Sequence, residues 1–454
     1  NNTWTNNSYV NIGPSFINQT SGNGSTWAVS LPNSKLAMVV GDVVYLNGNN
    51  WFGNARLAAL NTSNGTAWYP NPTWYLENGS VLGGSLYNHG YHMAYLIGDV
   101  IYFDASGEFA AYNTSNNSGW LVKDINTNTT YSYGHSNPGS LFSTLMGDTI
   151  YFSASSGNAS LGVELWAHNT SNGTTWRVGH TNTTGTLPTT TAFTSYGRDL
   201  GVIDDTIYFQ AWGSGDEGLW AYNTSNTTMW QIDFRSTSRS ANPGMCMAVV
   251  VGDSLYFDAD GSTHGRELWA HNHANQTTWM VKDFRTSNYH HQVRDGNPGC
   301  LGMSGVVVGD TFYLSATVSN SDGSGELWAH NTSNHSTWLV ADIRSGSPES
   351  IPGHYLAVVI GDTIYFDATS YGSGIYYGNR DLWAYDTSNK STWQVYNFTG
   401  AGKNIQSDAL LLSIGDTLYF VASGNIAGST GLWAHDTSNR STWVVEDGSS
   451  VGTT

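Results

Sequence analysis

A pattern of about 50 residues recurs eight times along this 454-residue chain and restricts what the chain can fold into. Most copies run from an apolar stretch through Gly-Asp, an aromatic stretch, a variable loop and Leu-Trp-Ala to a polar turn and Thr-Trp. The Gly-Asp step falls at 41–42, 98–99, 147–148, 252–253, 309–310, 361–362 and 415–416, with Asp204-Asp205 in the remaining copy. Spacings of 48 to 57 residues are typical of propeller blades.

The seventh copy shows why each repeat predicts four strands. Residues 356–360 are continuously apolar, as in a strand that is covered on both faces. Gly361-Asp362 predicts a two-residue hairpin turn, and 363–368 is rich in β-branched and aromatic residues. Residues 381–385 and 391–395 predict the third and fourth strands, joined by a polar turn. The repeat is therefore a four-stranded antiparallel meander, which cannot bury both faces alone.

We therefore predict an all-β fold: a single eight-bladed β-propeller of four-stranded antiparallel blades over residues 31–454. Residues 1–30 form an N-terminal tail with surplus strand material, because 23–30 repeat the turn and fourth strand a ninth time. Three interpretations of the tail stay open. It is a closure clasp for the last blade, a partial ninth blade, or a strand that pairs with a neighbouring molecule.

Composition excludes several functions. The net charge is −18, and phosphate binding requires clustered Lys and Arg, so we predict no nucleic-acid partner. No apolar run approaches the roughly 18 residues of a spanning helix, so we predict no membrane span. Only 11% of the residues are charged, and polarity comes from Asn, Ser and Thr. Attached sugars would keep such a surface soluble.

The turn before each Thr-Trp strand contains Asn-x-Ser/Thr-x-Trp, which has two interpretations. One is a hairpin with Asn in the left-handed region, which predicts Gly in some copies and leaves the Ser or Thr unexplained. The other is the N-glycosylation acceptor, which requires this spacing and which we favour. The nine acceptors are Asn23, Asn64, Asn116, Asn172, Asn226, Asn275, Asn334, Asn389 and Asn439.

Further acceptor motifs lie outside this position. Five stand three residues before one of the nine, at Asn61, Asn113, Asn169, Asn223 and Asn331. Others are Asn1, Asn6, Asn18, Asn78, Asn128, Asn158, Asn182 and Asn397. Such dense acceptors predict covalent N-glycans and an extracellular or cell-surface location.

Cys246 and Cys300 stand at nearly the same point in successive repeats, just after Asn-Pro-Gly. A disulfide between repeats and two buried free thiols are both open interpretations. His and Tyr exchange freely after Leu-Trp-Ala, as at His168 and Tyr222, with Tyr112 at the equivalent position of another repeat, and this argues for half-exposed packing residues against metal ligands. We find no motif for a catalytic residue, a metal or a cofactor, and predict a protein that is not an enzyme.

With Glu164-Leu-Trp166, Glu267-Leu-Trp269 and Glu326-Leu-Trp328 aligned, the chain resembles the ELWxxDGT repeat family over residues 23–447. Similar segments follow the turn at 121–125 and 281–284 and precede the motif at 260–267. The resemblance implies an extracellular, propeller-like repeat protein. The Asp-Gly-Thr turn of the family is replaced here by Asn-Thr-Ser-Asn, or Asp-Thr-Ser-Asn at 386–389 and 436–439, which installs acceptors.

Together these features predict a non-enzymatic, heavily N-glycosylated structural or adhesive protein. It would self-associate in a cell-surface coat or as the subunit of a filament. The alternative is a propeller binding module for a carbohydrate or protein ligand.

Overall fold

The computed structural model of the chain is all-β, and the residues that it describes contain no helix. These residues are 19–20, 26–27, 36–49, 55–61, 63–64, 66–70, 72–81, 86, 89–126, 135–157, 163–178, 199–213, 216–234, 241–261, 264–285, 295–300, 302–318, 325–344, 350–371, 379–398, 404–405, 411–423 and 430–446. Accordingly, this described part offers no helix with the length and apolarity that a membrane crossing requires.

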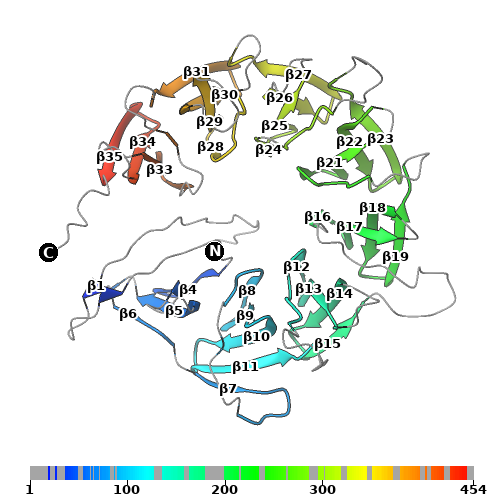
Figure 1. Ribbon diagram of the computed structural model, residues 1–454, viewed down its shortest axis with the longest axis vertical. Helices are drawn as coiled ribbons and strands as arrows, with labels where there is room; N and C mark the ends of the chain where they lie inside the picture. Colours follow the sequence, from blue (N-terminus) through cyan, green and yellow to red (C-terminus); the bar gives the residue numbers. More distant parts are fainter. Residues whose placement is uncertain are drawn as a thin grey trace. The chain divides into compact units, whose positions relative to one another are not determined.

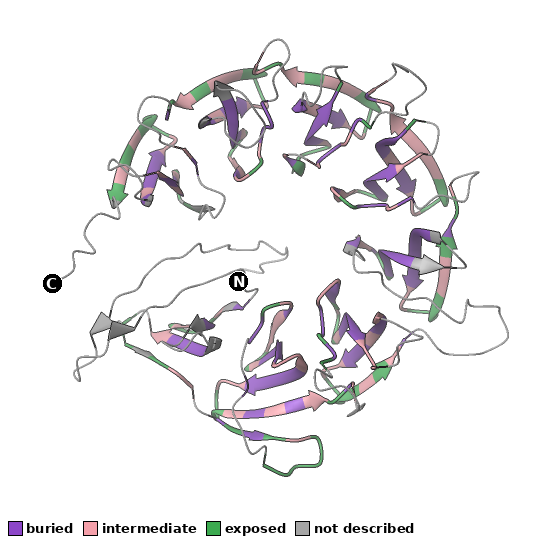
Figure 2. Cartoon of the chain, in the orientation of Figure 1, coloured by how far each residue is buried: buried purple, intermediate pink, exposed green. Residues whose placement is uncertain are grey.

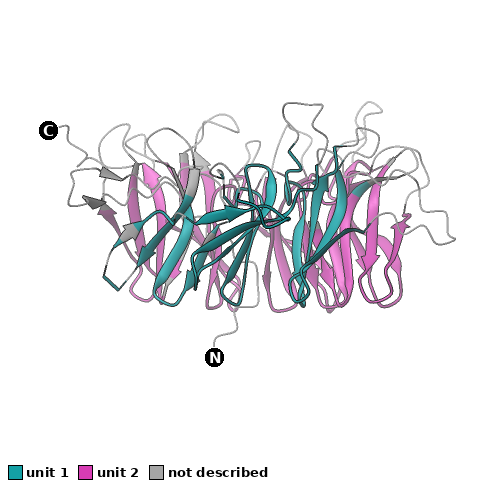
Figure 3. Cartoon of the chain, turned by 90° about the horizontal axis from the view of Figure 1, so that it is seen from below, with its two compact units in different colours: residues 1–197, 211–215 teal, residues 198–210, 216–454 magenta. Residues whose placement is uncertain are grey.

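The chain divides into two compact units (Figure 3), and the first comprises Asn1–Gly197 and Ala211–Gly215. Unit 1 holds a small sheet, β1 (Gln19–Thr20) with β2 (Thr26–Trp27), and three blades (Figure 1). Blade 1 is β3 (Ala37–Val40), β4 (Val43–Asn49), β5 (Ala55–Asn61) and β6 (Ala67–Trp68). Blade 2 is β8 (Ala94–Ile97), β9 (Val100–Ala105), β10 (Glu108–Asn113) and β11 (Ser118–Lys123), with the added β7 (Thr73–Tyr75). Blade 3 is β12 (Ser143–Met146), β13 (Thr149–Ser155), β14 (Val163–Asn169) and β15 (Thr174–Arg177).

Unit 2, Arg198–Gln210 and Asp216–Thr454, holds five blades. Blade 4 is β16 (Asp199–Ile203), β17 (Thr206–Gly213), β18 (Asp216–Asn223) and β19 (Thr228–Ile232), and blade 5 is β20 (Ala248–Val251), β21 (Ser254–Asp260), β22 (Arg266–Asn272) and β23 (Thr277–Lys282). Blade 6 is β24 (Ser304–Val308), β25 (Thr311–Thr317), β26 (Gly325–Asn331) and β27 (Ser336–Ala341). Blade 7 is β28 (Ala357–Ile360), β29 (Thr363–Tyr371), β30 (Asn379–Asp386) and β31 (Ser391–Tyr396), and blade 8 is β32 (Leu411–Ile414), β33 (Thr417–Ser423), β34 (Thr430–Asp436) and β35 (Ser441–Glu446).

These are eight four-stranded antiparallel blades, so the predicted fold class, an all-β eight-bladed propeller, is confirmed. Blade 7 follows the predicted strands closely, with Ile360 paired to Thr363 across the first hairpin. Gly361 takes a φ of +60° in that turn, a conformation that glycine adopts without steric cost. The recurring Gly-Asp step is thus the backbone requirement of a tight hairpin.

Within each unit the core lies between consecutive blades. Figure 2 shows the second and third strands largely buried, whereas the fourth strands are mostly intermediate or exposed. In unit 2, Tyr256 and Leu268 of blade 5 pack with Phe312 of blade 6 in one cluster. In unit 1, Phe109 of blade 2 packs on Phe152 of blade 3, with ring centroids 4.9 Å apart. Within each unit these meanders therefore bury apolar faces against a neighbouring blade, which removes aromatic surface from water.

Blade 2 contains a fifth strand that the repeat pattern did not predict. β7 pairs in parallel with β11, Thr73 opposite Ser118. Glu77, just beyond β7, accepts a hydrogen bond from Nζ of Lys123 at 2.8 Å. The segment between the first and second repeats thus covers the outer edge of blade 2.

In the N-terminal tail the structure describes only β1 and β2, in which Gln19 pairs with Trp27 and Thr20 with Thr26. Residues 1–18 lie outside the described residues. The three interpretations of the tail therefore stay predictions.

Candidate glycan-acceptor hairpins

The acceptor motifs lie on the hairpins that join the third and fourth strands of the blades. In blade 3, Oδ1 of Asn172 accepts a hydrogen bond from the backbone N–H of Thr174 at 2.9 Å and from its hydroxyl at 2.6 Å. The same pair of bonds recurs at Asn64, Asn116, Asn226, Asn275 and Asn334. Asn389 and Asn439 make the backbone bond. The Ser or Thr of the motif therefore has a structural role that the sequence analysis missed.

The left-handed residue of the hairpin is the one after the acceptor Asn, which corrects the simple turn interpretation. Gly173 has a φ of +71° and His335 a φ of +57°. The equivalent residues Asn117, Thr227, Gln276, Lys390 and Arg440 also have positive φ. Because the strained position is x in Asn-x-Ser/Thr, glycine is expected there, and Gly173 fulfils this expectation. Turn chemistry thus accounts for the glycine at position x and, through the hydrogen bonds to the Asn side chain, for the Ser or Thr of the motif.

The first Asn of each paired motif has a different environment. Oδ1 of Asn169 accepts hydrogen bonds from the backbone N–H groups of Ser171 and Asn172. Its Nδ2 donates to Oγ1 of Thr149 on β13 at 3.3 Å. Nδ2 of Asn223 and of Asn331 donate in the same way to a threonine of the second strand. At these three hairpins the nitrogen that would carry a sugar is already bonded within the blade.

The residues between the two asparagines attach the hairpin to the Gly-Asp turn. In blade 3 the Ser171 hydroxyl donates to Oδ2 of Asp148 at 2.6 Å, and the Thr170 hydroxyl donates to the Asp148 carbonyl at 3.0 Å. Ser333 and Asp310 make the serine bond in blade 6, also at 2.6 Å. The Gly-Asp hairpin and the acceptor hairpin of a blade are therefore joined by hydrogen bonds. This explains why Asp in the first hairpin and Ser in the second recur together.

The second Asn is the better candidate acceptor. Its side chain is exposed in all eight described hairpins. At Asn64, Asn116, Asn172, Asn226, Asn275 and Asn334 the contacts within the described residues bond Oδ1 and leave Nδ2 without a partner. Nδ2 of Asn389 and of Asn439 donate to Asp386 and Asp436 in the same turn.

Other predicted acceptors are only partly described. Asn78 accepts the same two bonds, from the N–H and hydroxyl of Ser80, in a turn after β7. Asn397 is exposed after β31. Asn1, Asn6, Asn18, Asn23, Asn128, Asn158 and Asn182 lie outside the described residues.

The His and Tyr residues after Leu-Trp-Ala are fully buried instead of half-exposed. His168, for example, is 3% exposed, and its ring lies 5.4 Å from that of Tyr102 in the preceding blade. Its Nδ1 shares a 2.8 Å hydrogen bond with the Thr175 hydroxyl. Burial lowers the pKa values of His168, His271 and His330 to about 4, so these rings are neutral in the fold. They are packing residues between blades.

The glutamates before Leu-Trp are buried acceptors. Glu267 accepts hydrogen bonds from the N–H of Phe284, which follows β23, and of Gly296, which leads into blade 6, at 2.8 and 3.0 Å. Burial raises the pKa of Glu267 to about 8 and that of Glu326 to about 7, and it also raises to about 7 the pKa of Glu108, which stands at the equivalent position before Phe109. Raised acid pKa values also occur in active sites. Here the glutamate carboxyl groups hold the connection between blades.

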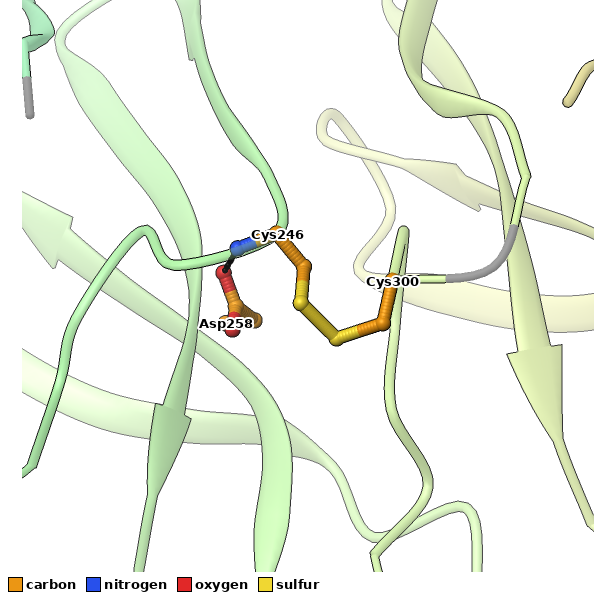
Figure 4. A group of neighbouring side chains, drawn as sticks. All are labelled: Cys246, Asp258 and Cys300. Carbon is orange, nitrogen blue, oxygen red and sulfur yellow. Dashed lines mark hydrogen bonds between the residues drawn. A yellow bond between two sulfur atoms is a disulfide. The ribbon is translucent and has the colours of Figure 1, made fainter. Parts of the chain in front are cut away.

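Cys246 and Cys300 form a disulfide between blades 5 and 6, with their Cα atoms 4.5 Å apart (Figure 4). Asp258 lies beside it, fully buried, and accepts hydrogen bonds from the N–H groups of Cys246 and Met247. Its other oxygen pairs with Arg266. The two cysteines and Asp258 would otherwise resemble a metal site, but oxidised sulfurs are not thiolate ligands.

No family model matches this chain, and no curated protein matches it. The resemblance to the ELWxxDGT family therefore stays a prediction. Among solved structures, Porphyromonas gingivalis dipeptidyl peptidase 4 is similar with 8% identity and a TM-score of 0.49, over 96% of this chain and 61% of that one. A prolyl endopeptidase gives 10% identity and a TM-score of 0.42, over 78% and 49%. The tricorn protease gives 11% and 0.31, over 94% and 44%.

These matches correct the prediction that the chain is not an enzyme. The similar chains are named as peptidases, so the absence of a recognisable catalytic motif does not support a non-enzymatic role. This chain spans only 44–61% of their length. At such low identity the likeness assigns no activity and no catalytic residue to this chain.

Proposed function

We propose that this chain is an extracellular glycoprotein whose propeller carries N-linked glycans on the hairpins between third and fourth strands. We further propose that it serves as a structural or adhesive subunit of a cell-surface coat or a filament. The observation that carries the proposal is the recurrence of one exposed acceptor Asn in each of the eight described hairpins. The low charged fraction, 11%, also supports it, since sugars would supply the missing surface polarity.

The hydrogen bonds of Nδ2 indicate which of the two asparagines in a paired motif would carry the glycan. Where Nδ2 of the first Asn donates to the second strand, as at Asn169, modification would break that bond. Modification of the second Asn, Asn172, would break no Nδ2 hydrogen bond within the described residues. We therefore propose that the second Asn is the principal acceptor.

The direct test is site-resolved glycopeptide mass spectrometry of the chain secreted from a glycosylating host. We expect high occupancy at Asn172, Asn226 and Asn334 and little at Asn169, Asn223 and Asn331. Asn172→Gln should remove the glycan of its hairpin, whereas the matched variant Asn169→Gln should leave it. Unmodified asparagines at all hairpins would refute the glycoprotein proposal.

Assembly is tested separately, on the same glycosylated protein. Size-exclusion chromatography and negative-stain microscopy at increasing concentration should show self-association. A monodisperse monomer at the highest concentration would contradict the coat and filament roles and leave the glycoprotein proposal intact.

A further inference from the structure

A groove of about 570 Å³ lies between blades 5 and 6, beside two acceptor hairpins. Blade 5 supplies most of its wall, including Asp253, Asn272, Asn275 and Trp279. Thr332 and His335, from the hairpin of blade 6, close the other side. This volume is in the range of small-ligand sites.

The lining has the chemistry that recognises a pyranose sugar. The Trp279 indole is half-buried and offers an apolar ring surface to the C–H face of a sugar. A carboxylate, amides and hydroxyls surround it, and these groups form hydrogen bonds with sugar hydroxyls. A groove of mixed aromatic and polar lining therefore fits a neutral carbohydrate.

We propose that this groove is a carbohydrate subsite that holds the proximal sugars of a glycan on Asn275, an inference that rests on the proposed glycosylation. Asn275 itself lines the groove, so the attached sugar would start at its wall. Oδ1 of Asn275 is held by the N–H and hydroxyl of Thr277, at 3.0 and 2.6 Å, which fixes the orientation of the side-chain amide. Trp279 lies on the same face of β23 as Thr277, because side chains alternate along a strand.

The chain contains a second Asn–Trp pair in which this arrangement is blocked, and it differs from the first also in that Nδ2 of Asn389 donates to Asp386. In blade 7, Asn389 and Trp393 have the same spacing as Asn275 and Trp279. There the guanidinium of Arg440, from the hairpin of blade 8, lies 5.6 Å from the centre of the Trp393 ring. Arg440 stands at the position that His335 occupies in blade 6. The ring of Trp393 that a sugar on Asn389 would contact is thus already covered by the Arg440 guanidinium.

The experiment measures how fast an N-glycan-releasing enzyme removes each glycan from the native protein, by site-resolved mass spectrometry. Occupancy of Asn275 and Asn389 is measured first. We expect the Asn275 glycan to be released about two- to tenfold more slowly than the Asn389 glycan, which corresponds to about 0.5–1.4 kcal/mol of sugar–groove contact. Trp279→Thr should bring the Asn275 rate to that of Asn389, whereas Trp393→Thr should leave the Asn389 rate unchanged.

Trp279→Phe is the control for a loss of folding, because it keeps an aromatic ring at this position. It should give a rate of glycan release from Asn275 between those of the wild type and Trp279→Thr. Equal release rates at two occupied sites, or no response to either Trp279 variant, would overturn the groove assignment and leave the glycoprotein proposal standing. An unmodified Asn275 beside occupied hairpins elsewhere would overturn the groove assignment as well. Absence of glycans everywhere would overturn both.

Discussion

Replacing both cysteines by serine, Cys246→Ser with Cys300→Ser, should destabilise blades 5 and 6. The disulfide joins residues 54 apart, and the loop that it closes contains the four strands of blade 5. In the chain-entropy model, closing a loop of this length lowers the conformational entropy of the unfolded chain and so stabilises the folded state by about 4 kcal/mol. The cross-link should therefore protect blade 5 more than any other blade.

Because each repeat packs only on its neighbours, unfolding of such a chain need not be two-state, and a single melting temperature would average over the blades. Native-state hydrogen exchange resolves them. We expect the slowest amides of β21 and β22 to exchange up to about a thousandfold faster in the double variant, the factor that corresponds to about 4 kcal/mol. Amides of blade 8 should change little.

Wild-type protein in reducing buffer provides the control, since it should match the double variant if loss of the cross-link is the cause. Unchanged exchange in β21 and β22, with the bond verified as intact in the wild type, would refute the reasoning. A uniform change over all blades would show instead that the chain opens as one unit.

Three further perturbations test other parts of the structure. His271→Tyr, the residue type of the equivalent position 385, should make stability less sensitive to acid. In the fold the pKa of His271 is about 4, below the ordinary value of 6.5. The neutral ring therefore contributes about 3 kcal/mol to the free energy of unfolding above pH 6.5, and this contribution is lost as the pH falls to 4. Thermal melts at a series of pH values would record the difference between the variant and the wild type. Gly361→Val should cost about 1–2 kcal/mol through its φ of +60° alone, since no atom lies within 4 Å of the added Cβ, and Gly361→Asn should cost less. Arg266→Leu should cost about 3–5 kcal/mol in urea unfolding by leaving the buried Asp258 unpaired, and adding Asp258→Asn should recover part of that loss.

The strand pattern was predictable because it depends on local signals. In blade 7 the boundaries of β28 and β31 differ from the predicted ones by a single residue, since hydrophobic runs and a glycine turn define them. β7 was not predictable in the same way. It lies outside the repeat, and its parallel pairing to β11 depends on how a connecting segment returns to the blade.

The chemistry of the hairpins was predictable only in part. Sequence identifies Asn172 and Thr174 as an acceptor motif, but not that the hydroxyl of Thr174 bonds to the Asn side chain. The distinction between Asn169 and Asn172 depends on Thr149, 20 residues away, which the strand register brings into contact. The burial of His168 likewise results from contact with another blade, which no local pattern reveals.

The fifth strand of blade 2 has a consequence for how the molecule avoids aggregation. In the sheet order of the described strands, β7 covers the outer edge of β11, whereas β15, β19, β23, β27, β31 and β35 each end their sheet. An uncovered edge presents unpaired N–H and C=O groups to any other extended chain.

Each of these bare edges begins two residues after an acceptor asparagine, as β23 does after Asn275. A bulky hydrophilic group at that point would sterically hinder a strand that approached from solvent. Sugars on the hairpins of these six blades would thus protect the outer strand edge, as β7 protects that of blade 2. Enzymatic removal of the sugars would leave the fold intact but would expose the edges to pairing with strands of other molecules.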